Sequence, residues 1–140
     1  MSVVRAAGLV VYRMNGTVPE FLLLKASYKP FHWTPPKGHL EAGEDEWTAA
    51  LRETKEESNI DASQLEIFKD CYEVQSYKAH GKDKTVKYWL ALLKNPDGVG
   101  LSDEHQNLTW AAHQEAIRIT EYPEMKTLFD KFSAYIQSKQ

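Results

Sequence analysis

Apolar residues in the first part of the chain fall into uninterrupted runs of strand length. Val3–Tyr12 is rich in Val, Leu and Ala, which predicts a strand covered on both faces. The pair Asn15-Gly16 predicts a tight turn. Phe21–Leu24 is a second apolar run and predicts a strand that returns beside the first.

Prolines at positions 30, 35 and 36 predict that Ser27–Glu46 is mostly loop. Helical periodicity follows over Glu44–Asn59. Asn59 tolerates the left-handed conformation in which many helices end. The residues expected to face the core from this helix recur at helical spacing: Trp47, Ala50, Leu51 and Thr54.

The second half of the chain predicts strands and then helices. The expected strands are Leu65–Tyr77, Thr85–Leu93 and a short one at Leu108–Ala111, with a polar loop at Lys78–Lys84; the expected helices are Gln114–Ile119 and Tyr122–Gln137. No linker or repeat divides the chain, so we expect residues 1–140 to form a single domain. The fold class is mixed α/β (α+β).

Composition narrows the functional classes. Of the 140 residues, 42% are hydrophobic and 26% charged, values that exclude a disordered or collagen-like chain. The net charge of −3 argues against a nucleic-acid partner. No apolar run is long enough to span a membrane and no secretion signal opens the chain. Together with the single Cys71, this predicts a reducing, cytoplasmic location without membrane attachment.

Three carboxylates crowd one face of the predicted helix. Glu53, Glu56 and Glu57 fall within about one third of its circumference, where like charges repel. One interpretation is a solvated acidic face with Arg52 and Lys55 as local partners. The other is a site for hard divalent cations, which prefer carboxylate oxygens and waters.

The residues around this face favour the metal site. Gly38, Glu44, Arg52-Glu53 and Glu56-Glu57 have the spacing of the Nudix box, so residues 38–60 resemble that motif. The resemblance implies a Nudix α/β/α sandwich with a central mixed β-sheet. It also implies hydrolysis of a nucleoside diphosphate linked to another group, with Mg²⁺, or alternatively Mn²⁺, as cofactor.

Two residues of the motif depart from the family pattern. Thr54 replaces the usual aliphatic residue, and its methyl group can pack in the core if its hydroxyl bonds back along the helix. Asn59 replaces the usual Gly and can adopt the same left-handed conformation. Neither change removes a carboxylate.

The Nudix resemblance also implies residue roles. Glu53, Glu56 and Glu57 match the metal ligands, Glu53 and Glu57 include the catalytic base, and Arg52 orients one glutamate. Glu44 is expected to be structural, at the helix start. Outside the box, Glu104 is expected to complete the metal site or act as base, with Asp103 as the alternative.

Residues before and after the box resemble one subfamily, the eukaryotic asymmetrical diadenosine tetraphosphate hydrolases. The matching segments are Ala26–Tyr28, Phe31–His39, Val86–Ala91 and Glu104-His105. The resemblance implies cleavage to ATP and AMP by attack at the fourth phosphate from the bound adenosine. Alternatives are another substrate, such as capped RNA, an inositol pyrophosphate or another dinucleoside polyphosphate, or a non-catalytic nucleotide sensor.

The expected partner is this small-molecule substrate, bound by a monomer. Lys37 and Lys84 are candidates to neutralise phosphates, with Lys78, Lys82 and Lys87 nearby, and His32 is a candidate donor to a phosphate oxygen. Tyr77 and Tyr122 are candidates to stack on adenine, and Tyr88 to bond phosphate or ribose. The alternative for each is a solvated lysine or a packing ring. The tryptophans are expected mainly in the core: Trp33, Trp47, Trp89 and Trp110.

Overall fold

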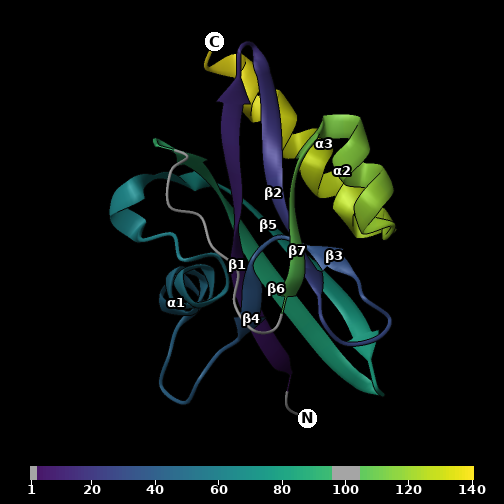
Figure 1. The fold of residues 1–140 in the computed structure, drawn as a ribbon. Coiled ribbons are helices and arrows are strands. Elements are labelled where there is room, and N and C mark those ends of the chain that lie inside the picture. Colours follow the sequence, from purple (N-terminus) through teal and green to yellow (C-terminus); the bar gives the residue numbers. More distant parts are fainter. Residues whose placement is uncertain (1–2, 96–104) are drawn as a thin grey trace.

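The protein is described by a computed structural model that covers residues 3–95 and 105–140. Its elements, in chain order, are β1 (Val4–Asn15), β2 (Val18–Ala26), β3 (Trp33–Thr34), β4 (Lys37–His39), α1 (Glu46–Ser58), a 3₁₀ turn (Ala62–Gln64), β5 (Leu65–Ala79), β6 (Lys82–Leu93), β7 (His105–Ala112), α2 (His113–Thr120) and α3 (Pro123–Ser138). These elements confirm the predicted α/β class (Figure 1).

One mixed sheet organises the molecule. Its strand order is β3-β2-β1-β6-β5, with β4 beside β1 and β7 beside β2. β1 and β6 run parallel, from the pair Val4–Lys84 to the pair Tyr12–Leu92. The other pairings are antiparallel.

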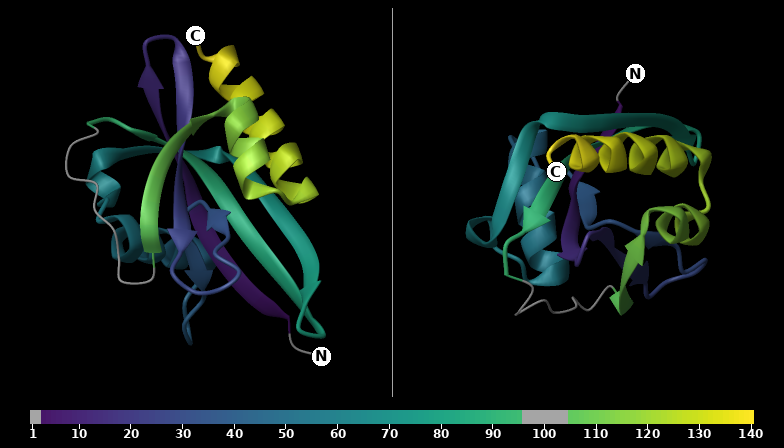
Figure 2. Two further views of the ribbon diagram at one scale, coloured as in Figure 1. Left: turned by 45° about the vertical axis from the view of Figure 1, so that its right-hand side comes forward. Right: turned by 90° about the horizontal axis from the view of Figure 1, so that it is seen from above.

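Helices cover both faces of this sheet, which explains the uninterrupted apolar runs of β1 and β2 (Figures 1 and 2). Alternate residues of each strand enter different cores. Val10 and Leu23 pack with Phe129 of α3, whereas Leu9 and Leu22 pack with Ala50 of α1. The sheet is therefore a middle layer between α1 and the α2–α3 pair.

The predicted strands and helices are found, with ends that differ by a few residues. Helix α1 begins at Glu46 rather than Glu44, because Asp45 is the N-cap and accepts a 2.8 Å hydrogen bond from the Thr48 amide. Trp89 is buried in the core, and Trp47 and Trp110 pack against it while half-buried. Trp33 also packs against the core and is half-buried.

The prediction of loop across residues 27–46 was wrong at two places. Trp33–Thr34 pairs with β2. Lys37–His39 pairs with residues 6–8 of β1, a stretch of that strand with which β2 does not pair. Each strand is too short to carry a periodic pattern, and the prolines between them hide both. Pairing with a long neighbouring strand supplies the hydrogen bonds that so short a segment needs.

The expected polar loop at Lys78–Lys84 was also wrong. Strands β5 and β6 continue through it, pairing Tyr77 with Lys84. The chain turns only at His80-Gly81, where both residues have positive φ (54° and 76°). Polar residues lie here on a projecting hairpin rather than in a loop.

The two unusual positions of the motif behave differently. Asn59 ends α1 in the left-handed conformation (φ 62°, ψ 25°), which confirms its predicted role. Thr54 is buried without the bond back along the helix, because its hydroxyl oxygen has no hydrogen-bond partner among the described residues. The backbone carbonyl of Thr54 instead accepts a 2.6 Å bond from Ser58 Oγ.

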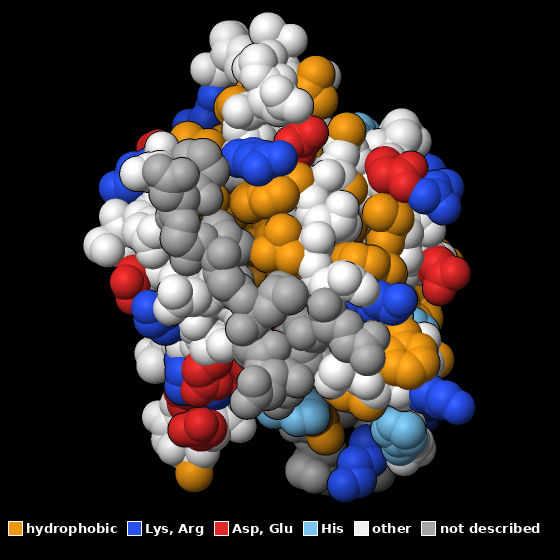
Figure 3. Space-filling view, viewed as in Figure 1, with side chains coloured by type: hydrophobic (Ala, Val, Ile, Leu, Met, Phe, Trp, Pro, Cys, Tyr) orange, Lys and Arg blue, Asp and Glu red, His pale blue; other side chains and the backbone are white. Residues whose placement is uncertain are grey.

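Surface charges of both signs lie next to one another on the face shown in Figure 3. Among the described residues, no helix combines the length and the apolar character needed to cross a membrane.

The helix end generates a test of backbone strain. We expect Asn59→Gly to change the free energy of unfolding by no more than about 0.5 kcal/mol, and Asn59→Ala to lower it by about 1–2 kcal/mol, because Ala resists positive φ. Both variants lose the 2.9 Å bond from Lys55 Nζ to Asn59 Oδ1, so their difference isolates the backbone. Urea unfolding measures it, and equal stability of the two variants would contradict the argument.

Candidate functional site

The site is built around the acidic face of α1. Glu57 is buried, and its Oε1 accepts a 2.9 Å hydrogen bond from the Lys37 amide of β4. Glu53 packs on the neighbouring Gly38, where an added Cβ would lie 2.1 Å from the Glu53 carboxyl carbon. Strand β4 therefore fixes two of the three carboxylates, and Gly38 is required for this close approach.

Arg52 holds the remaining parts of this face together. Its Nε lies 2.7 Å from Glu44 Oε2, and its Nη1 lies 3.0 Å from Glu53 Oε2 and 3.1 Å from Glu56 Oε2. Its Nη2 donates to the backbone carbonyl of His39 at 3.1 Å. One guanidinium thus links the loop before α1, the end of β4 and two of the crowded carboxylates.

These contacts shift the protonation of the groups involved. The hydrogen bonds from Arg52 lower the pKa of Glu44 to about 2, with a further contribution from the Glu41 amide. The same bonds raise the pKa of Arg52 above its ordinary value. Glu44 is therefore a charged structural partner of Arg52, just ahead of the Asp45 cap.

The carboxylates are near one another without forming a closed metal cage. Among residues 3–95 and 105–140, no three His, Cys, Asp or Glu side chains lie close enough together to hold an ion. Arg52 lies between Glu53 and Glu56 instead. Glu104 and its alternative Asp103 lie outside the described residues.

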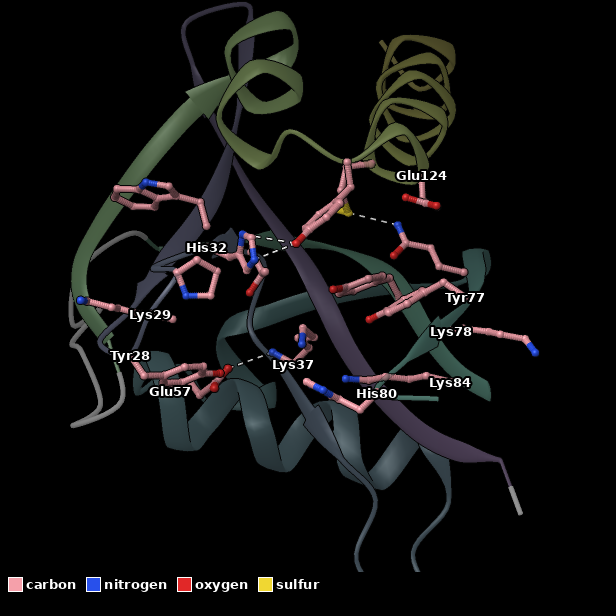
Figure 4. Close-up of a pocket in the computed structure, with 18 residues that line it drawn as sticks. Tyr28, Lys29, His32, Lys37, Glu57, Tyr77, Lys78, His80, Lys84 and Glu124 are labelled. Atoms are coloured by element: carbon pink, nitrogen blue, oxygen red, sulfur yellow. Dashed lines mark hydrogen bonds between the residues drawn. The ribbon is translucent and has the colours of Figure 1, made fainter. Parts of the chain in front are cut away.

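A cavity of about 780 Å³ opens beside the buried Glu57 (Figure 4). The six residues predicted to bind substrate all line it: His32, Lys37, Tyr77, Lys84, Tyr88 and Tyr122. They come from the segment before β3, from β4, β5 and β6, and from the α2–α3 connection. The fold thus brings together residues that are up to 90 positions apart.

Strand alternation separates Lys84 from Lys87. Lys84 and Tyr88 share one face of β6 and line the cavity, whereas Lys87 points to the other face, with its Nζ 4.4 Å from the ring centroid of Tyr72. Lys78 lines the cavity and Lys82 does not.

The two inner lysines form a cationic wall. Burial lowers the pKa of Lys37 despite the attraction of Glu57, and burial together with the charge of Lys37 lowers the pKa of Lys84. Two ammonium groups held close together in a partly desolvated wall favour an anionic ligand, which would relieve their repulsion.

Three tyrosines and a histidine also line the cavity, and Tyr77 lies beside the lysines, with its ring centroid 5.9 Å from Lys84 Nζ. Tyr122 Oη lies 2.7 Å from His32 Nε2, which joins the α2–α3 connection to the segment before β3. Tyr77 is partly exposed and its ring is available at the cavity surface. Tyr88 is almost fully buried, and burial raises the pKa of its hydroxyl well above the ordinary value.

Sequence reasoning missed several lining residues. Those of polar or aromatic character are Tyr28, Lys29, Trp33, Thr34, Gln75, His80 and Glu124. Among them, Tyr28 presents a large ring, and 65% of this residue is exposed. The expected strand alternation on β5 was a usable signal for Gln75, because it lies two residues before Tyr77 on the same face. No local pattern marked the others.

Comparison with known proteins gives a consistent result. Residues 3–132 match the NUDIX domain family. A Caenorhabditis elegans protein named bis(5'-nucleosyl)-tetraphosphatase [asymmetrical] is 60% identical over 96% of this chain and 97% of its own length. The Sus scrofa protein of the same name is 43% identical, with 96% of each chain covered.

Comparison with solved structures also finds similar proteins. A crystal structure of a C. elegans Ap4A hydrolase binary complex has a TM-score of 0.94 and 59% identity, and it covers 96% of this chain and 98% of its own. A Nudix hydrolase from M. smegmatis, at 19% identity and a TM-score of 0.77, shares the fold.

The contact between Gly38 and Glu53 generates a test of the metal site. We expect Gly38→Ala to displace the Glu53 carboxylate and to weaken Mn²⁺ binding at least tenfold, as loss of a ligand's support generally does. Titration followed by electron paramagnetic resonance measures the affinity. Gly16→Ala is the control, because its positive φ of 64° adds strain where nothing lies within 4 Å. Wild-type affinity in Gly38→Ala would contradict the assignment of Glu53.

Proposed function

Because the chain belongs to the Nudix hydrolase family, we propose that it hydrolyses diadenosine tetraphosphate asymmetrically, to ATP and AMP. The C. elegans relative whose name states this activity is 60% identical, and the match covers nearly the whole length of both chains. The observation that carries the proposal is the cavity itself, which brings aromatic rings and lysines together beside the buried Glu57. This combination suits a nucleoside joined to a polyphosphate.

The adenosine end is assigned to the aromatic rings of the cavity. Tyr77 and Tyr122 are the stacking candidates from the sequence, and the exposed ring of Tyr28 on the same cavity is a further one. The phosphates follow toward Lys37 and Lys84, with His32 as a donor to a phosphate oxygen. Tyr88 contributes its hydroxyl from the cavity wall.

Nudix hydrolases use divalent metals, and the acidic face of α1 fits such an ion by the chemistry of its donors. Glu53, Glu56 and Glu57 offer carboxylate oxygens from adjacent turns of one helix. Such oxygens are hard ligands suited to Mg²⁺, with Mn²⁺ as the alternative. These three would hold the metal, with Glu104 as the further candidate from the sequence. When bound, the ion neutralises phosphate charge and lowers the pKa of a bound water.

The protein's own groups supply orientation and proton transfer. The Lys37 amide fixes Glu57 and Arg52 fixes Glu53, so either carboxylate is placed to accept a proton from the attacking water. The water oxygen bonds to the fourth phosphorus from the bound adenosine, and the bridging P–O bond on its far side breaks. ATP leaves with negative charge that Lys37 and Lys84 stabilise, and AMP carries the new oxygen.

Product analysis in ¹⁸O-labelled water tests the reaction. With diadenosine tetraphosphate and Mg²⁺, we expect ATP and AMP in equal amounts, with the label in AMP alone. Two ADP molecules would overturn the cleavage position. Binding without any product would indicate a sensor, and faster turnover of capped RNA or an inositol pyrophosphate would reassign the substrate.

The role of Glu57 is tested by a conservative change. We expect Glu57→Gln to lower kcat at least a hundredfold with little effect on the fold, because the amide oxygen can still accept the Lys37 bond but binds neither metal nor proton as well. Glu115→Gln on α2 is the matched control, since Glu115 pairs only with Arg118 among the described residues. Turnover of Glu57→Gln near the wild-type rate would remove Glu57 from the mechanism.

A further inference from the structure

A second hollow, of about 430 Å³, lies at the other end of β4. Its lining includes Val4 and Arg5 of β1, His39 and Leu40 at the end of β4, and Glu41 and Glu44 of the following loop. Lys37 of the same strand lines the larger cavity. The two hollows are therefore separated along β4 by only the residue Gly38, against which Glu53 packs.

His39 brings the hollow to the face of the sheet that carries the cavity, whereas Arg5 lines it from the face that carries α1. Lys37 and His39 lie two positions apart on β4, so their side chains share one side, and β1 places Gly8 and Ala6 opposite them. β6 continues these two rows with Tyr88 and Val86. Burial and the charges of Lys84 and Lys37 lower the pKa of His39, which agrees with a position at the end of the cationic wall.

The chemistry of the hollow differs from that of the cavity. It presents two carboxylates, of which Glu44 is bound to Arg52 at 2.7 Å while Glu41 is 67% exposed and 3.5 Å from Arg52 Nη1. A carboxylate repels phosphate but accepts hydrogen bonds from ribose hydroxyls, as acidic residues do in nucleotide-binding folds. Val4 and Leu40 add apolar surface, and His39 adds a planar ring. Arg5, the arginine of the lining, is already paired with Glu46, to whose Oε2 its Nε donates at 3.1 Å. The lining therefore suits an uncharged nucleoside better than a phosphate.

The reaction requires a nucleoside close to this place. On the proposed function, the phosphorus attacked is the one that carries the second adenosine, through a single P–O–C5′ linkage. That phosphorus lies at the glutamates, so the second adenosine has to lie directly beside them. We propose that the hollow between His39 and Glu41 binds the second nucleoside of the substrate, opposite in direction to the cavity that binds the first.

The inference rests on the proposed function and is tested by comparing two substrates. Diadenosine tetraphosphate and adenosine 5′-tetraphosphate have the same four phosphates, but only the first has a second nucleoside. We expect His39→Ala and Glu41→Ala each to lower kcat/KM about threefold to tenfold more for diadenosine tetraphosphate than for adenosine 5′-tetraphosphate, the range for one lost hydrogen bond or contact.

Tyr77→Ala is the contrasting variant, because it lies in the cavity for the first nucleoside. We expect it to lower kcat/KM equally for both substrates. Equal losses for both substrates in His39→Ala and Glu41→Ala, or none, would overturn the second site while leaving the proposed function intact. Failure of the wild-type protein to hydrolyse either substrate would instead overturn the proposed function. Thermal unfolding of each variant separates loss of binding from loss of folding.

Discussion

The guanidinium of Arg52 is the interaction on which the acidic face depends. Carboxylates crowded on successive turns repel one another, and a helix that carried them without compensation would be destabilised. Arg52 offsets this by pairing with Glu44, Glu53 and Glu56 from one planar group, the geometry in which arginine binds several oxygens at once. Its bond to the His39 carbonyl also ties the helix to the sheet.

A steric constraint complements this electrostatic one. Gly8 lets β1 approach the chain at Pro36-Lys37, where an added Cβ would lie 2.1 Å from the Pro36 carbonyl oxygen. Gly38 lets Glu53 approach β4 from the other side. Two missing side chains therefore set the spacing between strand, loop and helix. The carboxylates are positioned by the sheet as much as by their own helix.

Local signals in the sequence predicted the parts of the fold that depend on local physics. The α1 helix followed from periodicity and from the tolerance of Asn59 for positive φ, and β1 and β2 followed from continuous apolar runs. Strands β3 and β4 escaped prediction because long-range pairing alone defines them. The hairpin at His80-Gly81 escaped prediction because its polar composition is typical of a loop.

The site shows the same division. Glu53, Glu56 and Glu57 could be placed on one face by helical geometry, whereas the contact between His32 and Tyr122, 90 positions apart, follows only from the fold. Tyr28 and Glu124 became visible only when the chain was folded. The unpartnered hydroxyl of Thr54 could not be foreseen, since a helical threonine has a backbone carbonyl within reach and here does not use it.

The parallel pairing of β1 with β6 has a consequence for how the protein is made. Val4 pairs with Lys84, so β1 can pair with β6 only after some eighty further residues have been synthesised. Such non-local pairing slows folding, because the entropy of closing a long loop is lost before the contacts form. During synthesis, the glutamate-bearing helix therefore leaves the ribosome after Lys37 but before Lys84, the second lysine of the cationic wall. Until β6 is made, Arg52 and Lys55 of the helix itself offset the repulsion between its carboxylates.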